Sequence, residues 1–164
     1  MKILGINLAE HGSICMLNDG QIELYLEAER ITREKYDFKV HKIFDMVSKP
    51  DAIALADCDY GIGRKGNEKP LYTSMAKAKI SRKYPDVPIH DFTNLHHLTH
   101  ASVGYYTSHF LEAVCVVVDG LGSNKEIESI YHISHNEFVR VQKRLYKPES
   151  QGFGRLFELT AIEH

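Results

Sequence analysis

Cysteine and long apolar runs are scarce in this 164-residue sequence, and each scarcity excludes a class of protein. The three cysteines lie far apart without any CxxC spacing, which excludes a disulfide framework or a zinc knuckle. We predict that Cys15, Cys58 and Cys115 are reduced core residues of a cytoplasmic protein. No apolar run approaches the roughly 20 residues of a membrane span, and Met1 leads directly into a strand pattern without a signal peptide.

Neither sign of charge dominates the sequence. Twenty Lys and Arg oppose 22 Asp and Glu, so the net charge is −2 and no global field would gather nucleic acid or an anionic membrane. The hydrophobic fraction of 43%, the charged fraction of 26% and only five prolines are typical of a soluble globular protein. The length suffices for one domain of ordinary size with a real core.

Histidine is abundant, and three of the ten histidines lie within five positions. His96 and His100 are four residues apart, so on a helix both imidazoles project from one face with Cβ atoms about 6 Å apart. That separation suits one transition-metal ion. The alternative is a solvated, histidine-rich helix start. His97 points elsewhere on such a helix and is expected to orient a neighbour or to contact phosphate.

Asp119 follows an apolar run, 113–118, that we expect to be a buried strand. It is followed by Gly120-Leu121-Gly122. A carboxylate between a core strand and a glycine-rich loop is where α/β proteins place phosphate or metal chemistry. The N–H groups of Gly120 and Gly122 could contact a phosphate, although such a loop is also a common turn.

The spacing of apolar residues predicts strands, helices and turns along the chain. An Asp-Gly turn at 18–20 between two apolar runs is a strong signal for a β-hairpin. The glycine-bearing segment 61–70 predicts a loop, and Asn94 is placed to cap the helix that carries the histidines. The predicted strands are 2–7, 13–17, 21–27, 51–56, 87–91, 113–118, 127–134 and 137–146, and the predicted helices are 40–48, 74–83, 95–107 and the start of one at 158–164.

Three strands, then alternating helices and strands, then three strands again predict a duplicated ribonuclease-H-like α/β fold with a mixed sheet flanked by helices. The first subdomain is predicted at 1–110 and the opening strands of the second at 111–164. The second copy is cut short. We therefore expect a fragment of a longer protein, or a chain that a partner completes.

Four ordered blocks carry a resemblance to a known family: ILGIN…HGS at 3–13, EAERITREKYD at 27–37, HHLTHA at 96–101 and VDGLG at 118–122. Together they resemble the amino-terminal domain of the O-carbamoyltransferases of the nodulation and antibiotic-tailoring type. That family is related to the universal tRNA threonylcarbamoyl transferase subunit, within the actin/Hsp70/sugar-kinase superfamily. Residues 152–158 resemble the family's helix-opening segment.

The resemblance implies a two-step reaction. A carboxyl-terminal domain, absent from this sequence, makes carbamoyl-adenylate from carbamoyl phosphate and ATP. The amino-terminal domain transfers the carbamoyl group to a hydroxyl of a sugar, antibiotic or nucleoside-like acceptor. Iron or a similar divalent metal sits on the two histidines of the HxxxH pair and on aspartates, in contact with the nucleotide phosphate. The parent protein is thus expected to be an enzyme, and the 164-residue chain alone to be inactive.

The resemblance also assigns residues. His96, His100 and Asp119 correspond to metal ligands, and a further aspartate ligand would lie beyond His164. Arg30 and Lys35 could hold acceptor or phosphate groups, because Arg binds anions bidentately, or could form a solvated, salt-bridged turn. The positions expected to contact the nucleotide or other cofactor are Asn7, Gly12, Ser13, Arg30, Lys35, Gly120 and Gly122.

His11 and Tyr36 are the catalytic candidates. His11 matches a family histidine that could act as base on the acceptor hydroxyl, or it is simply a polar turn residue. Tyr36 replaces a family histidine, and a pKa near 10 makes tyrosine a poor base at neutral pH. Gly12 stands where an aspartate is usual, and Ser123 where a glutamate commonly follows. These departures bear on catalysis more than on fold.

Two other functions compete with O-carbamoyl transfer. The chain could be a non-catalytic module that binds nucleotide or metal, or a threonylcarbamoyl transferase acting on tRNA. The adjacent pair His96-His97 and the Glu-x-Glu-Arg block fit the O-carbamoyl branch better. Lys77, Lys79, Arg82 and Lys83 are expected to form a solvated face, and would contact phosphates only if the acceptor were a nucleic acid. No pattern indicates the oligomeric state.

Overall fold

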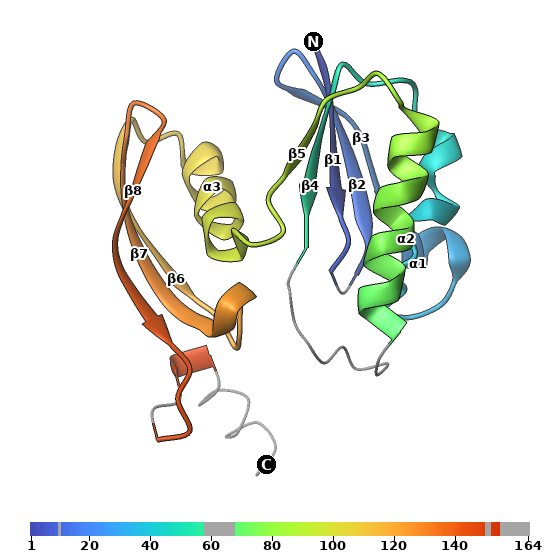
Figure 1. Cartoon of the computed structure of the whole chain (residues 1–164). Coiled ribbons are helices and arrows are strands. Elements are labelled where there is room, and N and C mark those ends of the chain that lie inside the picture. The colour runs from blue at the N-terminus through green and yellow to red at the C-terminus, as the bar shows by residue number, and fades with distance from the viewer. Residues whose placement is uncertain (10, 58–67, 150–151, 155–164) are drawn as a thin grey trace. The chain divides into compact units, whose positions relative to one another are not determined.

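The computed structural model describes residues 1–9, 11–57, 68–149 and 152–154. The chain forms two compact units, Met1–Thr93 and Asn94–His164, called here the first and second unit (Figure 1). The compact units differ from the predicted subdomains, 1–110 and 111–164, in placing the histidine-bearing helix with the second unit. The predicted boundary marks the point where the strand pattern repeats, whereas the compact units are defined by contacts. The predicted boundary therefore stays a prediction.

The first unit is built on a mixed five-stranded sheet in the order β3-β2-β1-β4-β5. β2 is antiparallel to β1 and β3, whereas β4 is parallel to β1 and β5 is parallel to β4. This order and these directions are those of the ribonuclease-H-like fold, so the predicted fold class is confirmed. The strands are β1 (Lys2–Asn7), β2 (Ser13–Asn18), β3 (Gln21–Glu27), β4 (Ala52–Ala56) and β5 (Ile89–Asp91).

The hairpin between β2 and β3 forms where the Asp-Gly turn predicts it. Asn18 pairs with Gln21, and the two residues between them, Asp19 and Gly20, have φ of 47° and 82°. A two-residue turn with both φ values positive has the twist that adjoining antiparallel strands need. The turn therefore sets the register of the sheet's outermost strand.

The helices of the first unit differ most from the sequence prediction. The helix predicted at 40–48 is two short 3-10 helices, η1 (Val40–Lys42) and η2 (Phe44–Met46), and Ile43 between them, at φ −116° and ψ 0°, departs from the dihedral angles of a regular α-helix. Val40, Ile43 and Phe44 are all buried, so packing of these side chains overrides helix propensity. A short helix, α1 (Ala28–Thr32), occupies the charged segment for which a solvated, salt-bridged turn was one of the two alternatives.

The long helix α2 spans Glu68–Lys83, so the prediction of a start at residue 74 is wrong. The predicted loop 61–70 is also wrong at its end, since residues 68–70 are helical, and 61–67 lie outside the described residues. Pro70 is tolerated there because the N–H groups of a helix's first turn have no intrahelical partner. α2 lies against the sheet (Figure 1), and its Ala76 and Ile80 are fully buried in the core of the first unit.

The second unit packs one helix on a three-stranded antiparallel sheet with the order β6-β7-β8 (Figure 1). Its core joins Ala101 and Tyr105 of the helix to Val117, Tyr131 and Ile133 of the sheet. The elements are α3 (His96–Ser108), β6 (Glu112–Val118), the 3-10 helix η3 (Ser123–Lys125), β7 (Glu126–Ser134) and β8 (Glu137–Leu145).

The run expected to be a buried strand is buried on one face only. Val117 is 7% exposed and packs in the core, whereas Val114 and Val116 are 68% and 60% exposed on the opposite face. The prediction of a fully buried β6 is therefore wrong, because helix α3 covers one face of this sheet and no described element covers the other.

Cys15 and Cys115 are free thiols, each partly buried, and burial raises the pKa of both. Cys58 and the helix predicted at 158–164 lie outside the described residues. Among the described residues, no helix has both the length and the apolar character that crossing a membrane requires.

Candidate metal centre

Three histidines begin helix α3, as the sequence predicts. The predicted cap is wrong: Leu95 occupies the N-cap position, and no side chain caps the helix. Within the first turn, the hydroxyl of Thr99 donates to the carbonyl of His96 at 2.7 Å. His96 and His100 lie one turn apart on the same face, with ring centroids 4.5 Å apart.

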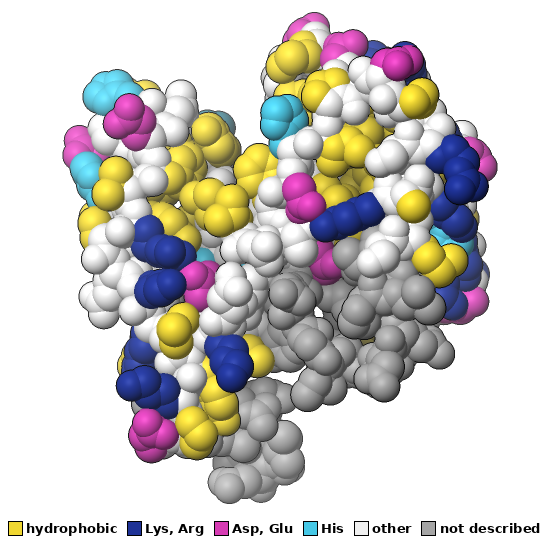
Figure 2. Space-filling view, in the orientation of Figure 1, with side chains coloured by type: hydrophobic (Ala, Val, Ile, Leu, Met, Phe, Trp, Pro, Cys, Tyr) yellow, Lys and Arg dark blue, Asp and Glu magenta, His cyan; other side chains and the backbone are white. Residues whose placement is uncertain are grey.

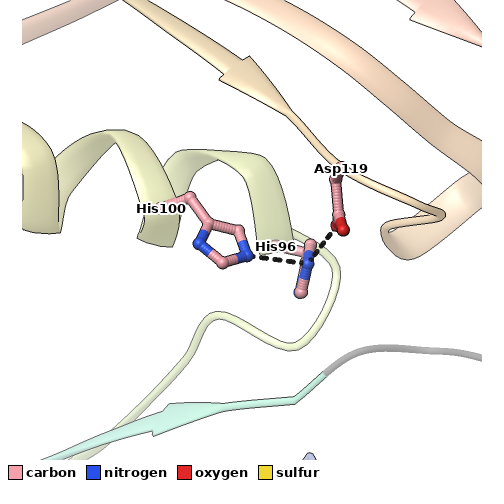
Figure 3. A group of neighbouring side chains, drawn as sticks. All are labelled: His96, His100 and Asp119. Atoms are coloured by element: carbon pink, nitrogen blue, oxygen red, sulfur yellow. Dashed lines mark hydrogen bonds and ion pairs between the residues drawn. The ribbon is translucent and has the colours of Figure 1, made fainter. Parts of the chain in front are cut away.

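The ligand atoms of His96, His100 and Asp119 converge (Figure 3), as helical spacing predicts for the two histidines and as the family resemblance implies for Asp119. Nε2 of His96 lies 2.6 Å from Oδ2 of Asp119 and 3.0 Å from Nε2 of His100. All three donor atoms lie within 4.8 Å of one another. Ligands about 2.1 Å from one metal ion are roughly 3.0–3.4 Å apart, so the cluster needs only small shifts to hold a cation.

The backbone fixes the carboxylate of Asp119. Its N–H donates to the carbonyl of Ile127 at 2.9 Å, which ties the end of β6 to the start of β7. The N–H of Gly120 donates to Oδ1 of Asp119 at 2.7 Å. Oδ1 is thereby held by the loop while Oδ2 faces the histidines, an orientation that leaves Oδ2 as the ligand atom.

Gly122 is required here because the loop passes against the histidine rings. A Cβ at this position would lie 2.9 Å from Cδ2 of His96 and 2.9 Å from Nε2 of His97. Its N–H donates to the carbonyl of Glu126 at 2.6 Å. Since the N–H groups of Gly120 and Gly122 both have internal acceptors, phosphate contact through them requires those bonds to be exchanged. Their phosphate-binding role stays a prediction.

The electrostatics of the cluster favour the forms that bind cations. Desolvation, followed by the nearby charge of His96, lowers the pKa of His100. Burial alone would raise the pKa of Asp119, but the hydrogen bond and charge of His96 and the N–H of Gly120 outweigh it and lower that pKa. An ionised Asp119, a neutral His100 and a His96 that loses its proton on coordination form a ligand set that suits iron(II), zinc or manganese. The residues therefore fit the predicted divalent metal.

Sequence reasoning missed the polar side chains behind the histidines. His97 is fully buried, and its Nδ1 lies 2.7 Å from the hydroxyl of Ser129. Glu126, also buried, pairs with Arg140 of β8 at 2.6 Å. Only the register of β7 and β8 brings these residues behind α3, and one sequence does not show that register. Arg140 belongs to β8, the strand over which Lys and Arg side chains gather in Figure 2.

The two catalytic candidates, His11 and Tyr36, lie in the first unit and contact each other. The rings of His11 and Tyr36 meet edge to face with centroids 4.9 Å apart. Nδ1 of His11 lies 3.5 Å from Oε2 of Glu29, and the same oxygen accepts the N–H of Tyr36 at 3.0 Å. That backbone hydrogen bond, followed by the charges of Arg30 and His11 acting against desolvation, lowers the pKa of Glu29. Glu29 is thus a partner of His11 that the sequence did not reveal.

The other predicted residues of the opening block have structural partners. Gly12 lies so close to the next loop that a Cβ would be 2.6 Å from the carbonyl oxygen of Phe38, so a larger residue would require that loop to move. The amide of Asn7 donates to the carbonyl of His11 at 3.4 Å and accepts from the N–H of Ala9 at 3.0 Å. Ser13 is buried in the sheet. Their contact with a nucleotide stays a prediction.

The basic side chains predicted to bind anions have other partners in the structure. Arg30 pairs with Glu27 at 3.1 Å on the surface, the salt-bridged arrangement weighed as the alternative to anion binding. Lys35 lies 5.1 Å from the ring centre of Tyr36. On α2, Lys77 and Lys83 pair with Asp91 and Asp45, both at 2.7 Å. Anion binding by Arg30 and Lys35 stays a prediction.

No protein-family model and no curated protein sequence matches the chain. YeaZ from Pseudomonas aeruginosa is similar in structure, with a TM-score of 0.46 and 16% identity over 91% of this chain and 70% of that one. A Ppx/GppA family protein from Aquifex aeolicus has a TM-score of 0.46 and 12% identity, over 88% of this chain and 51% of that one. A ROK family protein from Streptococcus pneumoniae, solved with sucrose, has a TM-score of 0.45 and 14% identity, over 88% of this chain and 50% of that one.

The chain therefore spans about half the length of the second and third of these proteins. The strand order and strand directions of the first unit define the fold. The side chains of the second unit form the candidate site.

Proposed function

We propose that this chain is the amino-terminal part of an O-carbamoyltransferase that uses a divalent metal, with iron as the first candidate. The observation that carries the proposal is the convergence of His96, His100 and Asp119, the residues that the sequence resemblance assigns to the metal. The ribonuclease-H-like strand order supports it, because that is the fold the resemblance implies.

In the proposed reaction, the oxygen of an acceptor hydroxyl attacks the carbamoyl carbon of carbamoyl-adenylate. The bond between that carbon and the phosphate oxygen breaks, AMP leaves with the electron pair, and the hydroxyl proton passes to a base. His11 is the candidate base, and Glu29 beside its Nδ1 would leave Nε2 to accept the proton. A bound divalent ion would supply Lewis-acid stabilisation of the phosphate's negative charge.

The metal part of the proposal is tested by titrating the metal-free protein with Co²⁺ and following the visible absorption of the bound ion. We expect one equivalent to bind the wild-type chain and the variant H96A/H100A to bind none. His132 is a matched control, since it is a histidine of the same unit that pairs only with the exposed Glu112 among its described contacts. H132A should bind Co²⁺ as the wild type does. Stoichiometric binding by H96A/H100A would overturn the assignment.

The transfer part is tested with the full-length gene product and this chain side by side. We expect ATP consumption that depends on carbamoyl phosphate from the full-length protein, and none from the 164-residue chain. Loss of carbamoyl transfer in the full-length variant H11A, with ATP consumption retained, would place His11 in the transfer step. A full-length protein without carbamoyl-phosphate-dependent ATP consumption would contradict the proposed function.

A further inference from the structure

His97 is buried between the candidate metal centre and the sheet, and one of its ring nitrogens has no hydrogen-bond partner in the part of the chain that the structure describes. The side chain is 0% exposed, and its Nδ1 lies 2.7 Å from the hydroxyl of Ser129. Nε2 has no hydrogen-bond partner among the described residues. It lies 3.8 Å from Oδ2 of Asp119, beyond hydrogen-bond distance. A buried polar atom without a partner is costly, so its position calls for an explanation.

The partners of His97 decide which nitrogen carries the proton. A neutral imidazole has one N–H and one acceptor nitrogen, and a serine hydroxyl can serve either. With the proton on Nδ1, the bare lone pair of Nε2 would face the carboxylate of Asp119, which is repulsive. With the proton on Nε2, Ser129 donates to Nδ1 and the N–H faces Asp119. The surroundings therefore favour the form with the proton on Nε2.

The ring is held so that it cannot swing away from Asp119. Gly122 covers it, because even a Cβ there would lie 2.9 Å from its Nε2. Behind it, the buried Glu126 has one oxygen 3.9 Å from Nδ1 and the other 2.6 Å from Arg140. Arg140 draws the charge of Glu126 toward β8, which leaves Ser129 as the close partner of Nδ1.

Cation binding would remove the hydrogen-bond donor that His96 presents to Oδ2 of Asp119. In the present structure that oxygen lies 2.6 Å from Nε2 of His96. A coordinating Nε2 must turn its lone pair to the metal, so it can no longer donate a hydrogen bond to the carboxylate. Carboxylates that bind metals are themselves hydrogen-bonded by outer residues, which keep them oriented. A shift of about 1 Å would bring Oδ2 within reach of Nε2 of His97.

Building on the proposed metal site, we propose that His97 is a positioning residue for Asp119. Its Nε2–H takes over the carboxylate when His96 coordinates the cation, while Ser129 and Gly122 hold the ring in place. His97 then acts through Asp119 and is not itself a ligand. Outer hydrogen bonds of this kind are worth about 10- to 100-fold in metal affinity.

Two variants separate this role from simple packing. The amide nitrogen of asparagine reaches about as far as Nδ1 of a histidine, and that of glutamine about as far as Nε2. H97N should therefore keep a bond to Ser129 but lose the contact with Asp119, and H97Q should retain a donor for Asp119. We expect the Co²⁺ dissociation constant to rise about 10- to 100-fold in H97N, and H97Q to stay close to the wild type. The absorption bands of bound Co²⁺ should not move in either variant.

The outcomes distinguish the two proposals. Wild-type Co²⁺ affinity in H97N, or equal losses in H97N and H97Q, would overturn the positioning role and leave the metal site standing. A shift of the Co²⁺ bands in H97N would show that His97 is a ligand, which also overturns it. No Co²⁺ binding by the wild-type chain would overturn the metal site and this inference together. If H97N does not fold, S129A provides the same test, and unchanged affinity in S129A would overturn the role.

Discussion

Replacement of Gly122 by alanine tests how tightly the loop after Asp119 holds the histidines. Gly122 has φ −89° and ψ −174°, a conformation that any residue adopts, so the substitution introduces no backbone strain. The added Cβ would nevertheless lie 2.9 Å from Cδ2 of His96 and from Cδ2 and Nε2 of His97. Contacts between such atoms are normally about 3.5–4.0 Å, so the loop or both rings must move by several tenths of an ångström.

Overpacking of this kind costs about 1–3 kcal/mol. For a protein of this size, each kcal/mol lowers the midpoint of thermal unfolding by about 2–4 °C. We therefore expect G122A to unfold roughly 2–12 °C below the wild type, as measured by circular dichroism. Its Co²⁺ affinity should fall as well, because His96 is displaced.

Gly120 provides the matched control, since a Cβ there would meet no atom within 4 Å. G120A should keep the wild-type midpoint and the wild-type Co²⁺ affinity. Wild-type behaviour of G122A, or equal losses in G120A and G122A, would refute the close approach on which this reasoning depends.

Three further predictions concern the rest of the fold. G12D should destabilise the chain by about 1 kcal/mol or more in urea titration, because a Cβ there would clash with a backbone carbonyl oxygen 2.6 Å away. Burial alone would raise the pKa of Asp37, but hydrogen bonds from the Lys39 N–H and from Lys42 outweigh burial and lower that pKa. Asp37 therefore stabilises the fold above its unfolded pKa of about 3.9, and this stabilisation is lost as pH falls through the folded pKa. D37N should lower stability at pH 7 and flatten its loss in acid, and an unchanged pH profile would contradict this. V117A should lower the free energy of unfolding by about 1–3 kcal/mol and V116T by less than about 0.5 kcal/mol, because Val117 is 7% exposed and Val116 is 60% exposed. Equal losses of stability would show that both faces of β6 are covered.

The sequence predicts well the features that short-range patterns determine. The strands β1, β2 and β3 and the turn at Asp19 follow from alternation and turn chemistry. The meeting of His96 with His100 follows from helical spacing alone. The meeting of Asp119 with these histidines was implied only by the family resemblance, and the structure places its Oδ2 2.6 Å from Nε2 of His96.

Features that depend on tertiary packing could not be predicted in this way. Burial of Val40 and Phe44 breaks a segment that reads as one helix into two 3-10 turns. The exposed face of β6 cannot be predicted from its sequence, because a run of valines fits a half-buried strand as well as a fully buried one. Ser129 and Glu126, which lie beside His97, come from β7, and Arg140 of β8 pairs with Glu126, so only the folded sheet shows this arrangement.

The most direct test of the metal centre is an anomalous-difference map from crystals of the chain grown with Co²⁺. We predict one peak at about 2.0–2.2 Å from Nε2 of His96, Nε2 of His100 and a carboxylate oxygen of Asp119. A map with no peak at these three side chains, or with its strongest peak at other histidines, would contradict the account.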